Sequence, residues 1–294
     1  MKTVLIVLSF LLAACSHSRF FPVPPPDNSF AQPVSVAVKG YTGNIMEPFV
    51  SRDGNLLLFN NLNSAPENTN LHWATRVNDS SFQYQGELTG VNSTDLEGVP
   101  TMDSAGLFYF VSNRNYSQTL STLYQADFNS GHLSNVRLLQ GVSKLEPGWV
   151  NFDVEVSADG ANLYFVDAKF NASGQPASAD LVLAQQTGAG FKRVPANDST
   201  LQNINTDALE YAASISADGL TLYFTRVVLP LHENSSPEIF FSTRLSDKLP
   251  FGLPSKIICI TGFAEAPAIA PGGKILYYHK KENNRFVLYM VRKK

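Results

Sequence analysis

The strongest constraint on this chain of 294 residues is a segment of about thirteen residues that occurs five times. Its clearest copy is Asp153-Val-Glu-Val-Ser-Ala-Asp-Gly-Ala-Asn-Leu-Tyr-Phe165. The aromatic residues that close the five copies are separated by 51, 55, 59 and 54 residues, and they are Phe59, Phe110, Phe165, Phe224 and Tyr278. Each copy predicts a strand, a tight turn and a second strand. A period of this length indicates a repeat architecture.

The first four repeats each contain two further predicted strands, and the fifth contains one. In the first repeat these are Leu71 to Val77 and Phe82 to Thr89, separated by the turn Asn78-Asp-Ser80. Four strands in about fifty residues are typical of one propeller blade. The sequence therefore predicts an all-β protein, a five-bladed β-propeller of four-stranded antiparallel blades.

The two ends of the repeat region predict how the ring closes. The fifth repeat ends after its third strand, at Lys294, and lacks an outer strand. The segment Gln32-Pro-Val-Ser-Val-Ala-Val38 has strand character and precedes the first repeat. We expect it to supply the missing outer strand, which removes an open sheet edge. The propeller then covers residues 32–294 as a single domain, and we expect a monomer.

The amino terminus has the features of a targeting signal. Lys2 is followed by an apolar run from Val4 to Leu12 and by the small residues of Leu12-Ala-Ala-Cys15. This order resembles the lipobox of bacterial lipoproteins, which implies a signal peptide over residues 1–14 and lipid on Cys15. Ser16 then implies the periplasmic side of the outer membrane. Residues 15–31 contain four prolines, which favours an extended tether.

Charge and motifs narrow the possible functions. The formal net charge of −3 gives no reason to expect nucleic acid as a partner. The chain has no glycine-rich phosphate loop, no Gly-x-Ser-x-Gly elbow and no histidine pair with metal-helix spacing. These absences favour a binding protein over an enzyme. For His72 and His279, which lie in predicted strands, we expect packing or surface positions.

One acidic residue lies near the start of the first strand in each repeat. First strands line the channel of a propeller, so these residues are candidates for ligand or cation binding at one mouth: Glu47, Glu97, Asp153, Glu210 and Glu265. Converging carboxylates suit a hard cation such as Ca²⁺ or a basic segment, and they also suit glycoside cleavage. The alternative is structural, with each acid accepting backbone N–H groups of the next blade.

Long connections after the second strands are candidates for recognition, since loops carry function on rigid scaffolds. They cover residues 61–70, 112–121, 168–179 and 228–237. In the second of them, Arg114 and Tyr116 are residue types enriched in binding hot spots. The alternative is that these loops are solvated surface.

The repeated pattern Pro-x-x-Ser-x-Asp-Gly-x-x-Leu-Tyr-Phe occurs in full or in part in all five repeats. It resembles the WD-like propeller repeats of the TolB family of bacterial periplasmic proteins. The resemblance implies a propeller that binds or scaffolds a protein or glycan of the cell envelope. A carbohydrate-active hydrolase or lyase, using the channel carboxylates and possibly Ca²⁺, is the alternative.

Overall fold

The computed structural model describes residues 27–294, apart from residues 28, 65–67, 189 and 233–234. The predicted signal peptide, the lipidation site Cys15 and most of the predicted tether lie outside the described residues. Within them, no helix has the length and apolar character needed to cross a membrane.

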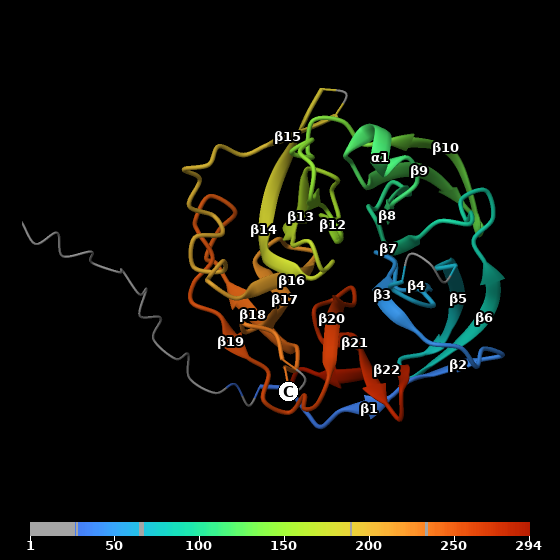
Figure 1. The fold of residues 1–294 in the computed structure, drawn as a ribbon. Coiled ribbons are helices and arrows are strands. Elements are labelled where there is room, and N and C mark those ends of the chain that lie inside the picture. Colours follow the sequence, from blue (N-terminus) through green and yellow to red (C-terminus); the bar gives the residue numbers. More distant parts are fainter. Residues whose placement is uncertain (1–26, 28, 65–67, 189, 233–234) are drawn as a thin grey trace, which may run out of the picture.

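The described chain forms five blades arranged in a ring (Figure 1). Blade 1 comprises β3 (Met46–Val50), β4 (Leu56–Asn60), β5 (Leu71–Asn78) and β6 (Ser81–Glu87). Blade 2 comprises β7 (Glu97–Met102), β8 (Leu107–Ser112), β9 (Leu123–Asn129) and β10 (His132–Leu138). The short helix α1 (Tyr116–Thr119) lies between β8 and β9.

The other three blades follow the same order, with small variations. Blade 3 comprises β11 (Trp149–Val150), β12 (Val154–Val156), β13 (Asn162–Phe170), β14 (Pro176–Thr187) and β15 (Gly190–Arg193). Blade 4 comprises β16 (Leu209–Ile215), β17 (Thr221–Val227), β18 (Glu238–Thr243) and β19 (Ser255–Lys256). Blade 5 comprises β20 (Ala264–Ile269), β21 (Ile275–Glu282) and β22 (Arg285–Arg292). The predicted five-bladed propeller is confirmed.

The predicted closure of the ring is also confirmed. Strand β1 (Val34–Ser35) pairs antiparallel with β22 and becomes the outer strand of blade 5. Strand β2 (Ala37–Lys39) follows at once and pairs parallel with β6 of blade 1. One short segment therefore joins the first blade to the last, and the two lie side by side in Figure 1.

The hydrophobic core consists of five clusters, one at each interface between neighbouring blades. The aromatic residues that define the repeat lie in these clusters, and each of the five is completely buried. An aromatic ring suits this position because it fills the wide gap between two twisted sheets with rigid apolar surface. The repeated pattern is therefore, in the first place, a packing pattern.

Four of the five first strands contain a β-bulge next to the channel. In each bulge one residue other than glycine has a positive φ, between 46° and 55°; these residues are Glu47, Val99, Ala212 and Ala266. Such a conformation is unusual for residues with a side chain and bends the strand. The first strand of blade 3 is instead interrupted between β11 and β12. These irregularities decide which side chains enter the channel.

The connection expected over residues 168–179 differs from the prediction. Strand β13 continues as far as Phe170, and β14 already begins at Pro176. The two strands therefore form a hairpin that projects from blade 3, and only residues 171–175 form its loop. The alternating apolar residues of β14 pair with β13 over most of that length. The hairpin therefore forms a two-stranded wall beside the channel, paired on its outer sides with β11 and β16.

Candidate active site

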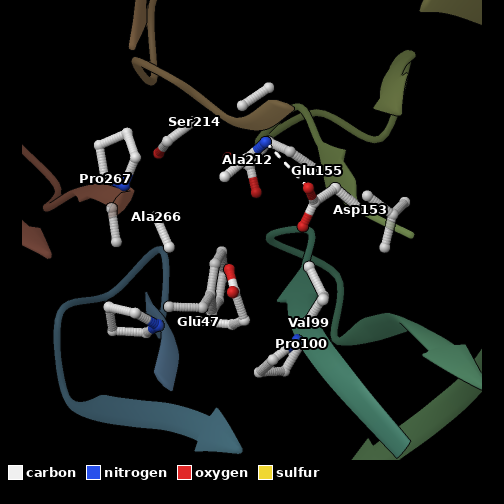
Figure 2. Close-up of a pocket in the computed structure, with 14 residues that line it drawn as sticks. Glu47, Val99, Pro100, Asp153, Glu155, Ala212, Ser214, Ala266 and Pro267 are labelled. Atoms are coloured by element: carbon white, nitrogen blue, oxygen red, sulfur yellow. Dashed lines mark hydrogen bonds between the residues drawn. The ribbon is translucent and has the colours of Figure 1, made fainter. Parts of the chain in front are cut away.

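Three of the five predicted acids meet at one end of the channel. Glu47, Asp153 and Glu265 come from blades 1, 3 and 5, and all three line a pocket of about 560 Å³. We call this end of the channel, where the first strands begin, the loop end. Figure 2 shows the carboxyl groups of Glu47 and Asp153 pointing into the channel from opposite blades.

The other two acids turn away from the channel and are completely buried inside their own blades. Glu97 accepts hydrogen bonds from the backbone N–H and hydroxyl of Ser93 and pairs with Arg114 at 2.8 Å. Glu210 has the equivalent arrangement with Thr206 and pairs with Arg226 at 2.7 Å. Each acid therefore connects the loop that enters its blade with the second strand of that blade, or with the loop after that strand. The role is structural, as in the alternative given above, but the contacts lie within one blade and not between two.

The difference follows from where each acid lies relative to the bulge of its first strand. Glu47 is itself the bulge residue and Glu265 directly precedes the bulge residue of blade 5, whereas Glu97 and Glu210 lie two residues before theirs. Because side chains alternate along a strand and the bulge adds one residue, positions one or two residues apart point in different directions. Three acids therefore face the channel region and two face the blade interior.

Glu265 is held from two sides. The hydroxyl of Tyr211, in blade 4, donates to Oε2 at 2.6 Å. Nε2 of the buried His279 lies 3.0 Å from Oε1. Since both oxygens serve as acceptors, the group is arranged as a carboxylate. Burial, followed by the charge of Glu265, raises the pKa of Tyr211 well above its usual range, so the phenol keeps the proton that it donates.

Asp153 is in the opposite situation. Burial raises its pKa well above the usual range, and the neighbouring charges of Glu47 and Glu265 raise it further. One oxygen, Oδ2, accepts the N–H of Ala212 in the next blade at 3.0 Å. The pKa of Glu47 is also raised by burial, although His279 and an Nδ2–H donated by Asn63 at 2.7 Å oppose the effect. The loop end thus holds acids with different preferences for a proton.

The walls of the pocket are apolar and aromatic. Phe152 packs edge-on against both Phe170 and Tyr211, with ring centroids 6.2 and 5.8 Å apart. Asn63 and Asn113 add side-chain amides from two of the long loops. Three of the four connections predicted for recognition therefore contribute to the same pocket as the acids. Apolar walls with a few polar groups are the usual composition of a small-molecule site.

Below the carboxylates the channel narrows to a cavity of about 30 Å³. That volume is enough for one or two water molecules and too small for a sugar ring. At the far end, which we call the turn end, Arg52 of blade 1 pairs with Glu155 of blade 3 at 3.0 Å. A ligand of larger size therefore enters from the loop end.

The two residues predicted for loop recognition lie outside this pocket lining. Arg114 pairs with Glu97 and lies over the rings of Phe110 and Tyr124. Tyr116 begins helix α1, and its hydroxyl donates to the carbonyl of Trp149 at 2.8 Å. Both side chains stabilise the loop in which they lie. A role for them in recognition stays a prediction.

A cation is the remaining possibility for this cluster. An oxygen of Glu47, an oxygen of Glu265 and a nitrogen of His279 lie within 4.8 Å of one another. Ca²⁺ requires six to eight oxygen ligands. Here one ligand atom is nitrogen, and the Glu265 oxygen nearest to it already accepts a hydrogen bond from it. The cluster as arranged therefore fits a hydrogen-bonded group better than Ca²⁺.

His279 and Tyr211 were not among the predicted site residues. One signal was available for His279, which directly follows the closing aromatic Tyr278, as Asn60 and Thr225 follow theirs. No sequence signal pointed to Tyr211, because its hydroxyl reaches an acid 54 residues away in the next blade.

Comparison with known proteins concerns the fold. No protein-family model matches the chain, and no curated protein matches it in sequence. A solved structure described as a glycoside hydrolase aligns with a TM-score of 0.61 at 12% identity, over 90% of this chain and 92% of its own. The catalytic domain of the GH62 α-L-arabinofuranosidase of Coprinopsis cinerea aligns with a TM-score of 0.54 at 14% identity, over 90% and 98%.

TolB from Acinetobacter baumannii also aligns, with a TM-score of 0.46 at 15% identity, over 86% of this chain and 55% of its own. That likeness is too weak to support an argument about TolB, so the resemblance of the repeats to the TolB family stays a prediction. The stronger alignments agree with the propeller fold, and at these identities they show the fold alone.

Proposed function

We propose that the protein is a glycoside hydrolase that cleaves its substrate at the loop end of the channel. The observation that carries this proposal is the pairing of Asp153 with Glu265 in one pocket. Burial favours the protonated form of Asp153, whereas Glu265 accepts two hydrogen bonds as a carboxylate. Two carboxyl groups in opposite protonation states are what glycoside cleavage requires.

In this reaction Asp153 is the general acid. It donates its proton to the glycosidic oxygen as the bond from that oxygen to the anomeric carbon breaks. Glu265 serves the opposite face of the sugar, as the base that takes a proton from water or as the nucleophile. Glu47 lies beside both and raises the pKa of Asp153, so it supports the protonated acid.

The pocket also indicates the charge of the substrate. Three carboxyl groups line it, and within the described part of the chain its lining contains no lysine or arginine. A uronic acid would place a fourth carboxylate among these groups with no basic partner, which is unfavourable in a partly desolvated site. A neutral glycan suits the pocket, and this favours the hydrolase over a lyase that acts on uronates.

The test is an assay of the purified protein on neutral polysaccharides, beginning with arabinans, with released reducing ends as the readout. Asp153→Asn and Glu265→Gln should each lower turnover by about 10²- to 10⁴-fold, the usual contribution of acid–base catalysis. Asp127→Asn, which changes an exposed acid in β9, is the isosteric control and should retain activity. A wild-type protein that releases no reducing ends from any substrate would count against the proposal.

A glycan- or protein-binding module of the cell envelope is the second candidate. The observation in its favour is the bond between Asp153 and the N–H of Ala212, which gives that acid a structural role between blades 3 and 4. Affinity electrophoresis in gels that contain the same polysaccharides separates the two functions. A binding module should migrate more slowly in such a gel and release no reducing ends. For either function we propose a lipid-anchored protein at the periplasmic side of the outer membrane, supported by the lipobox around Cys15.

A further inference from the structure

The bulges of the first strands are held by side chains of the preceding blade. Each bulge residue turns its backbone N–H towards a polar side chain across the interface. The four pairs, with donor N–H first, are Val99 and Asn60, Ala212 and Asp153, Ala266 and Thr225, and Glu47 and His279, at 2.9 to 3.1 Å. A buried N–H needs such an acceptor, so these contacts stabilise an otherwise unfavourable backbone conformation.

Three of the acceptors occupy the same position of the repeat, directly after the closing aromatic. In Thr225 the hydroxyl is the only polar group available, and in Asn60 the amide nitrogen bonds within its own loop. His279 differs, because its second nitrogen faces Glu265 of the pocket at 3.0 Å. Of the three side chains at this position, only His279 also contacts an acid of the candidate active site.

The two contacts of His279 determine where its proton lies. Burial lowers the pKa of the imidazole, and the hydrogen bond and charge of Glu265 outweigh burial and raise it. The N–H of Glu47 opposes protonation, since Nδ1 accepts it only while Nδ1 carries no hydrogen. The neutral ring with hydrogen on Nε2 is the form that satisfies both bonds. Phe286 packs edge-on against the ring, 5.3 Å between centroids, and limits its rotation.

We propose that His279 is a positioning residue for Glu265. As the neutral Nε2–H form it donates to Oε1, while Tyr211 donates to Oε2, and together they fix the plane of the carboxylate. The same ring fixes the backbone of Glu47, so the geometry of two acids depends on one side chain. The expected effect of His279 on turnover rests on the proposed hydrolase function. The expected protonation state of His279 does not.

The cation alternative makes the opposite prediction about the ring. A metal ion bound at Nε2 needs the lone pair there, which moves the hydrogen to Nδ1. Nδ1–H would then face the N–H of Glu47, and two donors would oppose each other. Binding of a metal by His279 would therefore require the bulge at Glu47 to rearrange.

The experiment combines kinetics with nitrogen NMR. His279→Asn retains an acceptor for the N–H of Glu47, as Asn60 does for Val99, and it removes the hydrogen bond to Oε1 of Glu265. Turnover should fall about 10- to 100-fold, as for a catalytic group displaced by about an ångström, while KM and the melting temperature change little. His279→Ala removes the cap as well and should also lower the melting temperature. Unchanged turnover in His279→Asn would overturn the positioning role.

The NMR measurement does not depend on activity. In the protein labelled with ¹⁵N-histidine, and with His279→Asn used for assignment, His279 should show hydrogen on Nε2 and none on Nδ1 at pH 8. A protonated Nδ1, or a shift of these signals on addition of millimolar Ca²⁺ or Zn²⁺, would overturn the assignment. An inactive wild-type protein with the expected signals would contradict the proposed hydrolase and leave the protonation state of His279 standing.

Discussion

The guanidinium of Arg52 in blade 1 lies 3.0 Å from the carboxylate of Glu155 in blade 3, across the turn end of the channel. The contact skips blade 2, whose Thr101 donates to the other oxygen of Glu155 at 2.5 Å. Arg52 also donates to the carbonyl of Met102, at the end of the first strand of blade 2. Three neighbouring blades are thus joined at a point where both charged side chains are more than nine-tenths buried.

Replacing Arg52 by methionine should destabilise the propeller strongly. The substitution leaves the Glu155 carboxylate buried without its partner, which typically costs about 3–5 kcal/mol of unfolding free energy. Chemical denaturation measures the effect. The double variant Arg52→Met with Glu155→Gln is the control, because glutamine keeps an acceptor and carries no charge. Its stability should recover by at least half, and an equally unstable double variant would mean that packing rather than charge is responsible.

Asp153→Asn should stabilise the protein increasingly as the pH rises. The pKa of Asp153 is raised in the folded state, so above the unfolded value near 4 the native protein binds a proton that the unfolded chain does not, and wild-type stability falls with pH. Asparagine lacks this penalty and can still accept the N–H of Ala212. The difference in unfolding free energy between the variant and the wild type should grow by up to about 1.4 kcal/mol per pH unit, until the pH passes the pKa of Asp153 in the folded state.

Melting curves of both proteins between pH 4 and 9 measure this difference. Glu47 and Glu265 contribute charge around Asp153 in both proteins, so their titration cancels to first order in the comparison. A difference that is constant with pH would show that Asp153 is ionised in the folded protein, which would also remove it as the general acid.

Phe170→Ala should weaken substrate binding without changing the chemical step. Phe170 lines the pocket, packs against Phe152 and has no polar atom near the carboxylates. Loss of its apolar surface should raise KM about tenfold or more and leave kcat within about threefold, as expected when an interaction is made equally in the ground and transition states. Phe128→Ala, which removes a partly buried ring in blade 2, controls for general destabilisation. Equal KM values in both variants would contradict a role for the wall.

Removing the closing segment should open the ring. A chain that begins at residue 27 retains β1 and β2, whereas one that begins at residue 40 exposes the edge of β22 and loses the bond from Val36 to the carbonyl of Leu288. Exposed strand edges favour association. We expect the shorter chain to melt at lower temperature and to aggregate in size-exclusion chromatography. Identical behaviour of the two chains would contradict closure by this segment.

Cys15→Ser should release the protein from the membrane. The lipobox around Cys15 predicts attachment of lipid to its sulfur, so wild-type protein made in a Gram-negative host should incorporate labelled palmitate and sediment with membranes. The variant should do neither. Cys259→Ser, which changes the other cysteine, should behave as wild type. Palmitate incorporation that survives Cys15→Ser would contradict the predicted anchor.

The repeat pattern alone was sufficient to predict the number of blades, the order of strands and the closing segment. Each of these depends on local properties: alternation within a strand, turn residues such as Asp159 and Gly160, and one aromatic in every unit. Blade interfaces repeat the same apolar contact five times, so a periodic sequence specifies them directly.

The composition of the site was decided by the tertiary structure. The sequence grouped Glu97 and Glu210 with the channel acids because all five lie at similar distances from their turns, but these two lie two residues before the bulge residues of their strands and point into their blades. Of the two partners of Glu265, His279 faces it across the β20–β21 pair of the same blade, whereas Tyr211 comes from blade 4 and reaches it only when blades 4 and 5 pack together. A bulge and a contact between blades depend on the backbone path of neighbouring units, and a pattern within one unit carries no information about that path.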